Sequence, residues 1–250
     1  MVKIYQKGKV MKYFELTCKA YLKNDISFKD SFEAISKYIS FSMAQNERLK
    51  NLHESKNYKF YVHNNFYPIE QDKLYKKGNI YEFKIRSIDE SFINALDMLL
   101  KQNTNNPNLL VVESCKKSIK QFFISEFYSI TPVISTYEIG KYWTMKQDGD
   151  ILKLQKLLQD NLEKKYNAFY GTKLSPTQNF IQLLEIKNQK PQNIWTSKNS
   201  KSFRFFGNKF KIIPNEDEIS QKLAFLALGC GLGEKNSFGG GFCLGKGLQK

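Results

Sequence analysis

The sequence has few of the residues that build metal sites and disulfides. Its 250 residues include two histidines and four cysteines, which are Cys18, Cys115, Cys230 and Cys243. No two cysteines have the Cys-x-x-Cys spacing of a structural zinc site, and the histidines are too few to complete one, so no metal is expected. Free thiols in a reducing compartment fit this pattern best.

Long apolar segments are also missing. No apolar run approaches the roughly 20 residues that a membrane-spanning helix needs. The first ten residues, MVKIYQKGKV, lack the apolar core of a secretory signal. We therefore expect a cytoplasmic protein that does not contact membranes, with residues 1–10 as an extension outside the fold.

Negative charge is scarce relative to positive charge. Lys and Arg total 39 against 24 Asp and Glu, which gives a net charge of +15 and a pI near 9.5. Such an excess favours a polyanionic partner, through attraction and counterion release. A basic protein from a lysine-rich genome would show the same balance, so charge alone leaves the partner open. Aromatic residues at 14%, many beside lysine, favour RNA because unpaired bases stack on aromatic faces.

The first half of the chain has the element order of a ferredoxin-like fold. Alternating apolar and polar residues predict four strands, at 12–22, 58–63, 79–86 and 109–114. Apolar residues at helical spacing predict helices over 31–43 and 88–102, the first capped by Ser27 or Asp30. The order β-α-β-β-α-β is the split βαβ pattern of such a domain.

The second half is predicted to repeat this arrangement. The expected elements are strands at 123–130, 131–136 and 180–187, helices over 148–169 and 216–228, and a hairpin over 202–214 that turns at Gly207-Asn208. We therefore predict an α+β protein of two tandem ferredoxin-like (RRM-like) domains, residues 11–121 and 122–250, with a glycine-rich loop near the C-terminus.

Glycine is concentrated in the tail of the chain. Gly229, Gly231, Gly233 and the run 239–241 surround a polar Glu-Lys-Asn-Ser core. A predicted helix precedes these glycines, whereas P-loops and dinucleotide fingerprints run strand, glycine loop, helix. Composition alone favours a tight structural turn over a loop that presents amide N–H groups and a lysine to phosphate.

The order of residues in the tail resembles a known family. The run from Gly231 to Phe242, GLGEKNSFGGGF, is similar to the GxGxxxxxGxG signature of CRISPR repeat-processing endoribonucleases, the Cas6 family. Residues 52–61, LHESKNYKFY, are similar to the segment that carries this family's acid–base histidine and its following lysine. The resemblance implies a glycine loop between two ferredoxin-like folds that helps to hold RNA.

The same resemblance implies three catalytic residues. His53 corresponds to the histidine, Lys59 to the positive partner, and Tyr38 to a tyrosine that some members use. Their chemistry needs no metal or cofactor, because the ribose 2′-hydroxyl of RNA is itself the nucleophile. A histidine, with an unperturbed pKa of about 6.5, transfers protons near neutral pH, and a lysine stabilises the developing negative charge. The products would be a 2′,3′-cyclic phosphate and a 5′-hydroxyl.

Helix geometry limits how Tyr38 and His53 can meet. In one straight helix they would lie about 22 Å apart at ~1.5 Å per residue, too far to share a phosphate. We therefore expect the chain to turn at Gln45-Asn46, with Asn46 capping a short second helix over 47–52. A core position is at least as compatible with the helical spacing of Tyr38.

Structural alternatives exist for the other candidates. His53 could be a solvated histidine at a helix end and Lys59 a strand-edge charge, while His63 competes for the catalytic role but is interpreted as a strand residue. Further candidates to contact RNA, in a positive groove between the domains, are Lys56, Arg204, Lys209, Lys211, Gly231, Gly233, Lys235, Asn236, Ser237, Gly239 and Gly241.

The sequence therefore predicts a metal-independent endoribonuclease that binds CRISPR repeat RNA and cleaves precursor crRNA. A non-cleaving RNA-binding subunit of a CRISPR surveillance complex would keep the fold and drop the chemistry. A generic RNA-recognition domain is disfavoured because no strand carries the RNP1 pattern. The resemblance leaves open whether other surveillance-complex subunits bind the chain, and whether it acts as a monomer or a homodimer.

Overall fold

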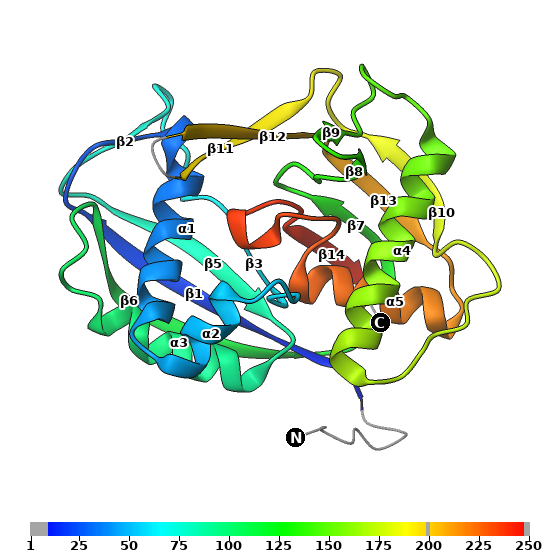
Figure 1. Cartoon of the computed structure of the whole chain (residues 1–250), viewed down its shortest axis with the longest axis horizontal. Coiled ribbons are helices and arrows are strands. Elements are labelled where there is room, and N and C mark those ends of the chain that lie inside the picture. Colours follow the sequence, from blue (N-terminus) through cyan, green and yellow to red (C-terminus); the bar gives the residue numbers. More distant parts are fainter. Residues whose placement is uncertain (1–9, 199–200, 248–250) are drawn as a thin grey trace.

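The computed structural model describes residues 10–198 and 201–247, which include two four-stranded antiparallel sheets, one in each half of the chain (Figure 1). The predicted extension at 1–10, apart from Val10, lies outside the described residues. The first sheet has the strand order β3-β5-β1-β6. Its strands are β1 (Lys12–Leu22), β3 (Tyr61–His63), β5 (Ile80–Ser87) and β6 (Leu109–Lys120).

Helices cover one face of the first sheet. They are α1 (Phe28–Ala44), the short α2 (Glu47–Glu54) and α3 (Glu90–Gln102), and a small ribbon pairs β2 (Ile26–Ser27) with β4 (Leu74–Tyr75). Apolar side chains of β1, α1 and α3 form a buried cluster between the helices and the sheet. The predicted β-α-β-β-α-β order is confirmed in this half.

The second sheet has the equivalent strand order, β10-β13-β7-β14. Its strands are β7 (Ile124–Ser129), β10 (Ile181–Ile186), β13 (Phe210–Pro214) and β14 (Cys243–Gly247), and its helices are α4 (Ile151–Tyr170), α5 (Glu218–Cys230) and the single turn η1 (Asn236–Phe238). In both sheets the third strand along the chain lies between the second and the first, so the predicted α+β fold with tandem ferredoxin-like halves is confirmed. No helix in the described part of the chain is long and apolar enough to cross a membrane.

The break predicted between the first two helices is present. Helix α1 ends at Ala44, and the side chain of Asn46 accepts a hydrogen bond from the backbone N–H of Leu49 at 3.1 Å, which caps α2. Ser27 is the N-cap of α1. The amide of Asn46 satisfies a donor that a helix start would otherwise leave unpaired, so α2 forms although it has only eight residues.

The predicted hairpin at Gly207-Asn208 is wrong. Strand β12 (Lys201–Gly207) pairs with β11 (Gln192–Lys198), whereas β13 pairs with β10 and β7. The chain leaves one ribbon and enters a sheet at this point, and a Cβ on Gly207 would lie 2.1 Å from the carbonyl oxygen of Val133. Close backbone contact, rather than a turn, explains this glycine.

The β11–β12 ribbon extends from the second half across to α1 (Figure 1). At its far end Ser197 donates from its backbone N–H to Glu33 of α1 at 2.7 Å. A second small ribbon joins β8 (Thr136–Glu138) to β9 (Lys141–Tyr142), and the predicted strand at 131–136 is otherwise limited to isolated bridges at Val133 and Ile134.

A buried arginine, which forms an ion pair in the first half, connects the two halves. Arg86 of β5 is 5% exposed, and it donates from Nε to Glu15 of β1 at 2.6 Å. Its guanidinium also donates to the backbone carbonyls of Leu228 at 3.3 Å and Cys243 at 2.5 Å, both in the second half. Helix α5 approaches β1 closely because residue 229 is glycine: a Cβ there would lie 2.7 Å from the Cβ of Tyr13.

Candidate nucleic-acid interface

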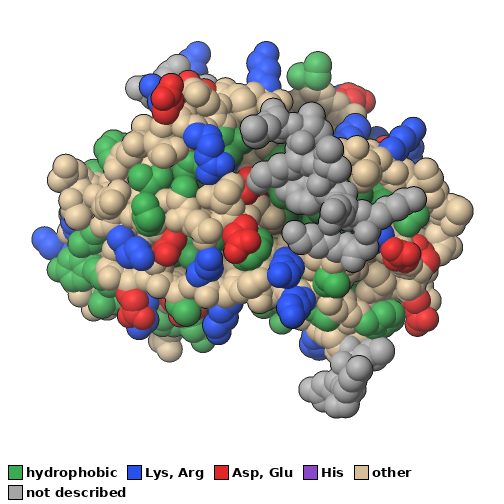
Figure 2. Space-filling view, turned by 90° about the horizontal axis from the view of Figure 1, so that it is seen from below, with side chains coloured by type: hydrophobic (Ala, Val, Ile, Leu, Met, Phe, Trp, Pro, Cys, Tyr) green, Lys and Arg blue, Asp and Glu red, His purple; other side chains and the backbone are tan. Residues whose placement is uncertain are grey.

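On the face seen from below, positive charge is not gathered into one broad patch. Figure 2 shows lysine and arginine side chains interspersed with acidic ones over the surface seen from below. Several surface lysines are in ion pairs, such as Lys19 with Glu113 at 2.7 Å. A site for an anionic partner must therefore be defined by the local arrangement of groups rather than by the net charge.

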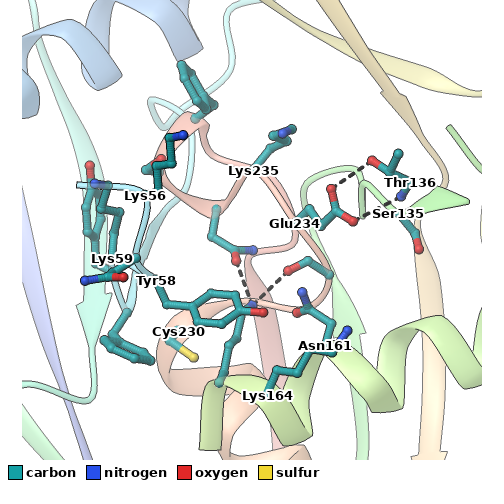
Figure 3. Close-up of a pocket in the computed structure, with 18 of the residues that line it drawn as sticks. Lys56, Tyr58, Lys59, Ser135, Thr136, Asn161, Lys164, Cys230, Glu234 and Lys235 are labelled. Atoms are coloured by element: carbon teal, nitrogen blue, oxygen red, sulfur yellow. Dashed lines mark hydrogen bonds between the residues drawn. The ribbon is translucent and has the colours of Figure 1, made fainter. Parts of the chain in front are cut away.

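Such an arrangement occurs in a cleft of about 520 Å³ between the two halves (Figure 3). The segment 55–61 before and within β3, helix α4 and the glycine segment 233–238 line it. Each contributes a lysine, respectively Lys56, Lys164 and Lys235. Lys59 and Lys165 line the cleft as well, so the structure brings together positive charge from three distant parts of the chain.

His53 lies beside this cleft. It occupies the last turn of α2, its side chain is exposed, and the cleft lining begins two residues later at Ser55. The Asn46 cap fixes where α2 starts and therefore where its last turn presents the imidazole. An exposed histidine two residues from the lining of a basic cleft is a candidate for proton transfer to a bound polyanion.

Lys59 holds the end of the helix that carries His53. Its ammonium donates to the backbone carbonyls of Leu52, His53 and Ser55, the last two at 2.7 Å. An ammonium has three N–H donors, and these bonds use all of them on carbonyls that a helix end leaves unpaired. Burial lowers the pKa of the half-buried Lys59. The ammonium of Lys59 thus caps α2, while the residue also belongs to the lining of the cleft.

Tyr38 is in the core rather than at the surface. Its side chain is fully buried, and its hydroxyl donates to the carbonyl of Leu100 at 2.6 Å and accepts from the N–H of Val111 at 3.1 Å. Burial raises the pKa of Tyr38 to about 12. The structure therefore does not bring this phenol to the exposed His53, and the core alternative describes its position.

His63 is a buried strand residue, as interpreted. Its Nδ1 donates to the carbonyl of Asn64 at 2.8 Å, so Nε2 is the acceptor for the Ser36 hydroxyl at 3.0 Å. Burial lowers the pKa of His63 to about 4, which keeps the ring neutral near pH 7. It packs against the glycine loop, where a Cβ on Gly239 would lie 3.0 Å from its Cε1. His63 is enclosed and cannot touch RNA in this conformation.

A buried lysine organises the glycine loop. Lys165 of α4 is 3% exposed, and its ammonium donates to the carbonyls of Gly231 and Gly233 at 2.8 Å each and to Oδ1 of Asn236 at 2.7 Å. Burial lowers the pKa of Lys165. Sequence analysis missed this residue, although a signal was present: it follows Leu162 by three positions, on the apolar stripe of the helix.

Most backbone amides of the loop are used internally. The backbone N–H of Glu234 donates to the carbonyl of Ile134 at 2.7 Å. The backbone N–H groups of Gly240 and Gly241 donate to the carbonyls of Lys235 at 3.1 Å and Pro132 at 2.9 Å, respectively. Gly241 has φ of 71°, and a Cβ there would lie 1.9 Å from the carbonyl oxygen of Leu232. These glycines let the backbone pack closely, so the loop contributes shape more than free amides for phosphate.

The basic residues expected in a hairpin are separated in the structure. Arg204 is exposed on β12, with its guanidinium 4.7 Å from the centre of the Trp195 ring. Lys211 on β13 pairs with Glu126 at 2.6 Å, and burial lowers the pKa of Lys209. None of the three belongs to the described residues that line the cleft.

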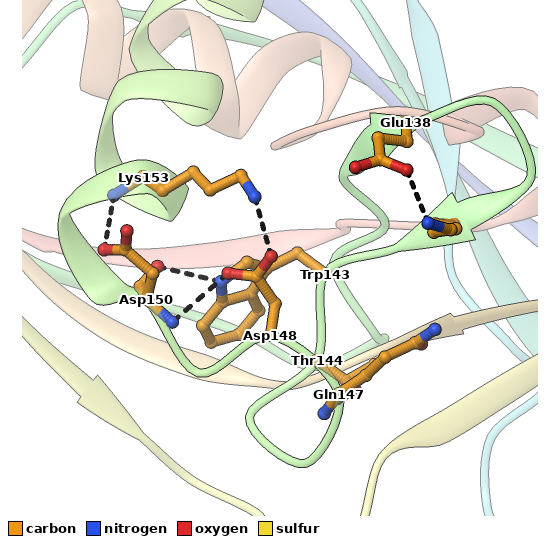
Figure 4. Close-up of polar contacts among 8 residues, drawn as sticks. Glu138, Trp143, Thr144, Gln147, Asp148, Asp150 and Lys153 are labelled. Atoms are coloured by element: carbon orange, nitrogen blue, oxygen red, sulfur yellow. Dashed lines mark hydrogen bonds and ion pairs between the residues drawn. The ribbon is translucent and has the colours of Figure 1, made fainter.

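Carboxylates of the second half, one in the cleft and two at the start of α4, are engaged in local structure. Glu234 accepts from the hydroxyl of Thr136 at 2.8 Å, and at the start of α4 Asp148 accepts from Lys153 at 2.7 Å while Asp150 caps the helix (Figure 4). Within residues 10–198 and 201–247, no group of three or more His, Cys, Asp and Glu side chains is placed to hold a metal ion.

Comparison with known proteins agrees on one family. The family model described as CRISPR associated protein Cas6, C-terminal, matches residues 115–244. CRISPR-associated endoribonuclease Cas6 2 of Methanocaldococcus jannaschii is 28% identical over 231 residues, which cover 85% of this chain and 92% of the relative.

Solved structures share the fold. One described as CRISPR associated protein Cas6 is 20% identical with a TM-score of 0.67, and the match covers 94% of this chain and 99% of that one. Another, described as an RAMP protein binding different RNA substrates, is 17% identical with a TM-score of 0.66, and the match covers 93% and 99%. The whole described architecture, not one half, is therefore shared.

Proposed function

This chain belongs to the Cas6 family, whose model matches residues 115–244 of its 250, and we propose that it is an endoribonuclease that binds CRISPR repeat RNA and cleaves precursor crRNA. The relative from Methanocaldococcus jannaschii is by name an endoribonuclease. The observation that carries the proposal for this chain is an exposed histidine, His53, in the last turn of α2, two residues before a cleft lined by lysines from three segments of the chain.

The proposed reaction uses the RNA's own nucleophile. The ribose 2′-oxygen attacks the adjacent phosphorus, the bond from phosphorus to the 5′-oxygen breaks, and a 2′,3′-cyclic phosphate and a 5′-hydroxyl form. His53 carries one of the two proton transfers, from the 2′-hydroxyl or to the departing 5′-oxygen. Lys56, Lys164 and Lys235 hold the phosphates and offset their charge, and Arg204 extends this contact. Tyr38, with its buried hydroxyl, has no part in it.

We expect the purified chain to cut CRISPR repeat RNA from its source genome once per repeat in the presence of excess EDTA. The upstream product should end in a cyclic phosphate, so a phosphatase acts on it only after acid opening, and the downstream product should accept a labelled 5′-phosphate. An RNA of the same composition in scrambled order is the control. Tight binding of repeat RNA without a cut would instead identify a non-cleaving subunit of a CRISPR ribonucleoprotein.

We propose that Lys59 is a positioning residue. Lys59→Met removes the three bonds to the end of α2, so the last turn should fray and His53 should lose its fixed position. A displacement of about 1 Å costs on the order of 10²-fold in rate, so we expect slower single-turnover cleavage by roughly 10–100-fold with little change in RNA affinity. Amide hydrogen exchange should rise in the last turn of α2.

Lys56→Met is the matched control for that variant. Lys56 is exposed and lines the cleft, so its loss should weaken RNA binding and reduce the salt dependence without faster exchange in α2. Lys59→Arg, which keeps several donors, should recover part of the rate. If Lys59→Met slows cleavage while α2 exchanges as in the wild type, Lys59 acts on the RNA directly.

A further inference from the structure

The cleft contains one buried polar side-chain atom for which the described residues offer no hydrogen-bond partner. Asn161 of α4 lines the cleft, and its Oδ1 is buried without a hydrogen bond. Leaving such an acceptor unpaired destabilises the folded state, which is why nearly all buried polar groups are paired. Asn167, on the same helix, shows the usual case: its Oδ1 accepts from the N–H of Leu174 at 3.2 Å.

The surroundings of Asn161 do not suit a phosphate, because the Lys165 ammonium that also lines the cleft is already bonded to three acceptors of the protein. Figure 3 shows Tyr58 and Asn161 reaching into the same hollow, from the segment before β3 and from α4. The half-buried carboxylate of Glu234 lines it as well, whereas Lys56 and Lys164 are exposed at its border. Phosphates therefore belong at the border, and the interior fits the neutral part of a nucleotide.

Tyr58 and Asn161 have complementary properties for that part. The half-buried Tyr58 ring offers an aromatic face on which a base can stack. Burial, together with the nearby Glu234, raises the pKa of Tyr58, so its hydroxyl keeps a proton to donate. Rotation of the Asn161 amide about its Cβ–Cγ bond exchanges Oδ1 and Nδ2, so the amide can offer an acceptor or a donor to the cleft.

We infer that Tyr58 and Asn161 form a subsite for one unpaired ribonucleotide of the bound RNA, with the base against Tyr58 and a donor group of the nucleotide bonded to Asn161. The donor is either an exocyclic amino group of the base or the ribose 2′-hydroxyl, which share hydrogen-bond donation to an amide oxygen. This inference rests on the proposed function and adds the position at which the protein reads its RNA. Because Oδ1 is buried in the free protein, the Asn161 side chain must turn toward the cleft to accept this bond, and it gains the missing partner only in the complex.

The first test separates this role from a structural one. Asn161→Ala removes an unpaired acceptor, so its melting temperature should equal or exceed that of the wild type. Asn167→Ala breaks an existing bond and should melt at a lower temperature with unchanged affinity for repeat RNA. A melting temperature of Asn161→Ala as low as that of Asn167→Ala, with unchanged RNA affinity, would overturn the inference.

The second test identifies the nucleotide and its donor. Repeat RNA carrying single 2′-deoxy substitutions, or single bases without the exocyclic amine, is titrated against the His53→Ala protein with and without Asn161→Ala. At one position the substitution should weaken binding by about tenfold in the presence of Asn161 and have no effect in its absence. A deoxy-sensitive position identifies the 2′-hydroxyl, and an amine-sensitive position identifies the base.

The outcome distinguishes the two proposals. If the wild type cuts repeat RNA but the Asn161→Ala variant is weakened equally for every substituted RNA, the subsite is refuted and the enzyme stands. If the wild type neither binds nor cuts repeat RNA, the proposed function fails and the subsite fails with it.

Discussion

Replacing His53 with alanine should lower the single-turnover rate of repeat-RNA cleavage by roughly 10²–10⁴-fold, the range supplied by one general acid–base group. The side chain is exposed at the end of α2, so the substitution should leave the core and the lysines of the cleft in place. Affinity for repeat RNA should therefore change little. Rates are measured with labelled RNA and saturating protein, and affinity by filter binding under the same salt conditions.

His63→Gln is the matched control for this variant. His63 is buried and bonded to Ser36 and Asn64, so its replacement should lower the melting temperature and leave the rate at saturation near that of the wild type. The reverse pattern, a normal rate for His53→Ala and a lost cut for His63→Gln at a temperature where both are folded, would transfer the catalytic role to His63.

Arg86→Met should destabilise the protein by about 3–5 kcal/mol at pH 7, as expected when one partner of a buried ion pair is removed. Glu15 would be left in the core with Lys84 at 3.1 Å as its remaining cation, and the carbonyls of Leu228 and Cys243 would lose their donor. Urea unfolding measures the change. Lys19→Met, which breaks the exposed pair with Glu113, should shift stability by less than about 1 kcal/mol.

The effect of Arg86→Met should depend on pH. Burial by itself raises the pKa of Glu15, but Arg86 and Lys84 outweigh it, so the pKa lies below its ordinary value of 4.5. A lowered carboxyl pKa stabilises the fold above the unfolded-state pKa, and this contribution is lost as pH falls through the folded-state pKa. Without Arg86, burial should raise the pKa of Glu15, so Glu15 should then destabilise the fold at neutral pH rather than stabilise it.

The stability difference between wild type and Arg86→Met should therefore be largest at pH 7 and smaller at pH 4. The wild type loses stability on acidification, while the variant is relieved of a buried charge as Glu15 takes up a proton. Urea unfolding at several pH values between pH 4 and pH 7 would show whether the unfolding free energies of the two proteins converge. A constant difference across the range would mean that Glu15 is not the group that Arg86 stabilises.

Local patterns were sufficient for most of the fold. Alternation marked β1 to its observed bounds, and helix geometry with a capping asparagine located the break at Asn46. These features depend on neighbours within a few residues, so the sequence shows them directly. The hairpin at Gly207-Asn208 failed because the strand partner of β12 was the unrecognised β11, and pairing between strands is not visible in the period of either one.

The helix end that carries His53 was predicted, whereas the contacts of the other candidate residues were not. His53 was placed correctly at a helix end. The hydrogen bonds of Lys59, Tyr38 and His63 were not predicted, because their partners come close only when the chain folds. The role of Lys165 was not predicted for the same reason. Its three acceptors lie more than sixty positions away, and only its place on an apolar stripe suggested burial.

Arg86 and Gly229 together fix how the two halves meet. The buried Arg86 side chain bonds to groups of both halves. Helix α5 lies so close to β1 at Gly229 that no side chain would fit at this position. Hinge rotation about this contact would have to unpair a buried guanidinium, so the cleft keeps its width whether or not it is occupied. The conformational adjustment on association then falls on the RNA, and repeats whose nucleotides are already splayed in solution should associate fastest.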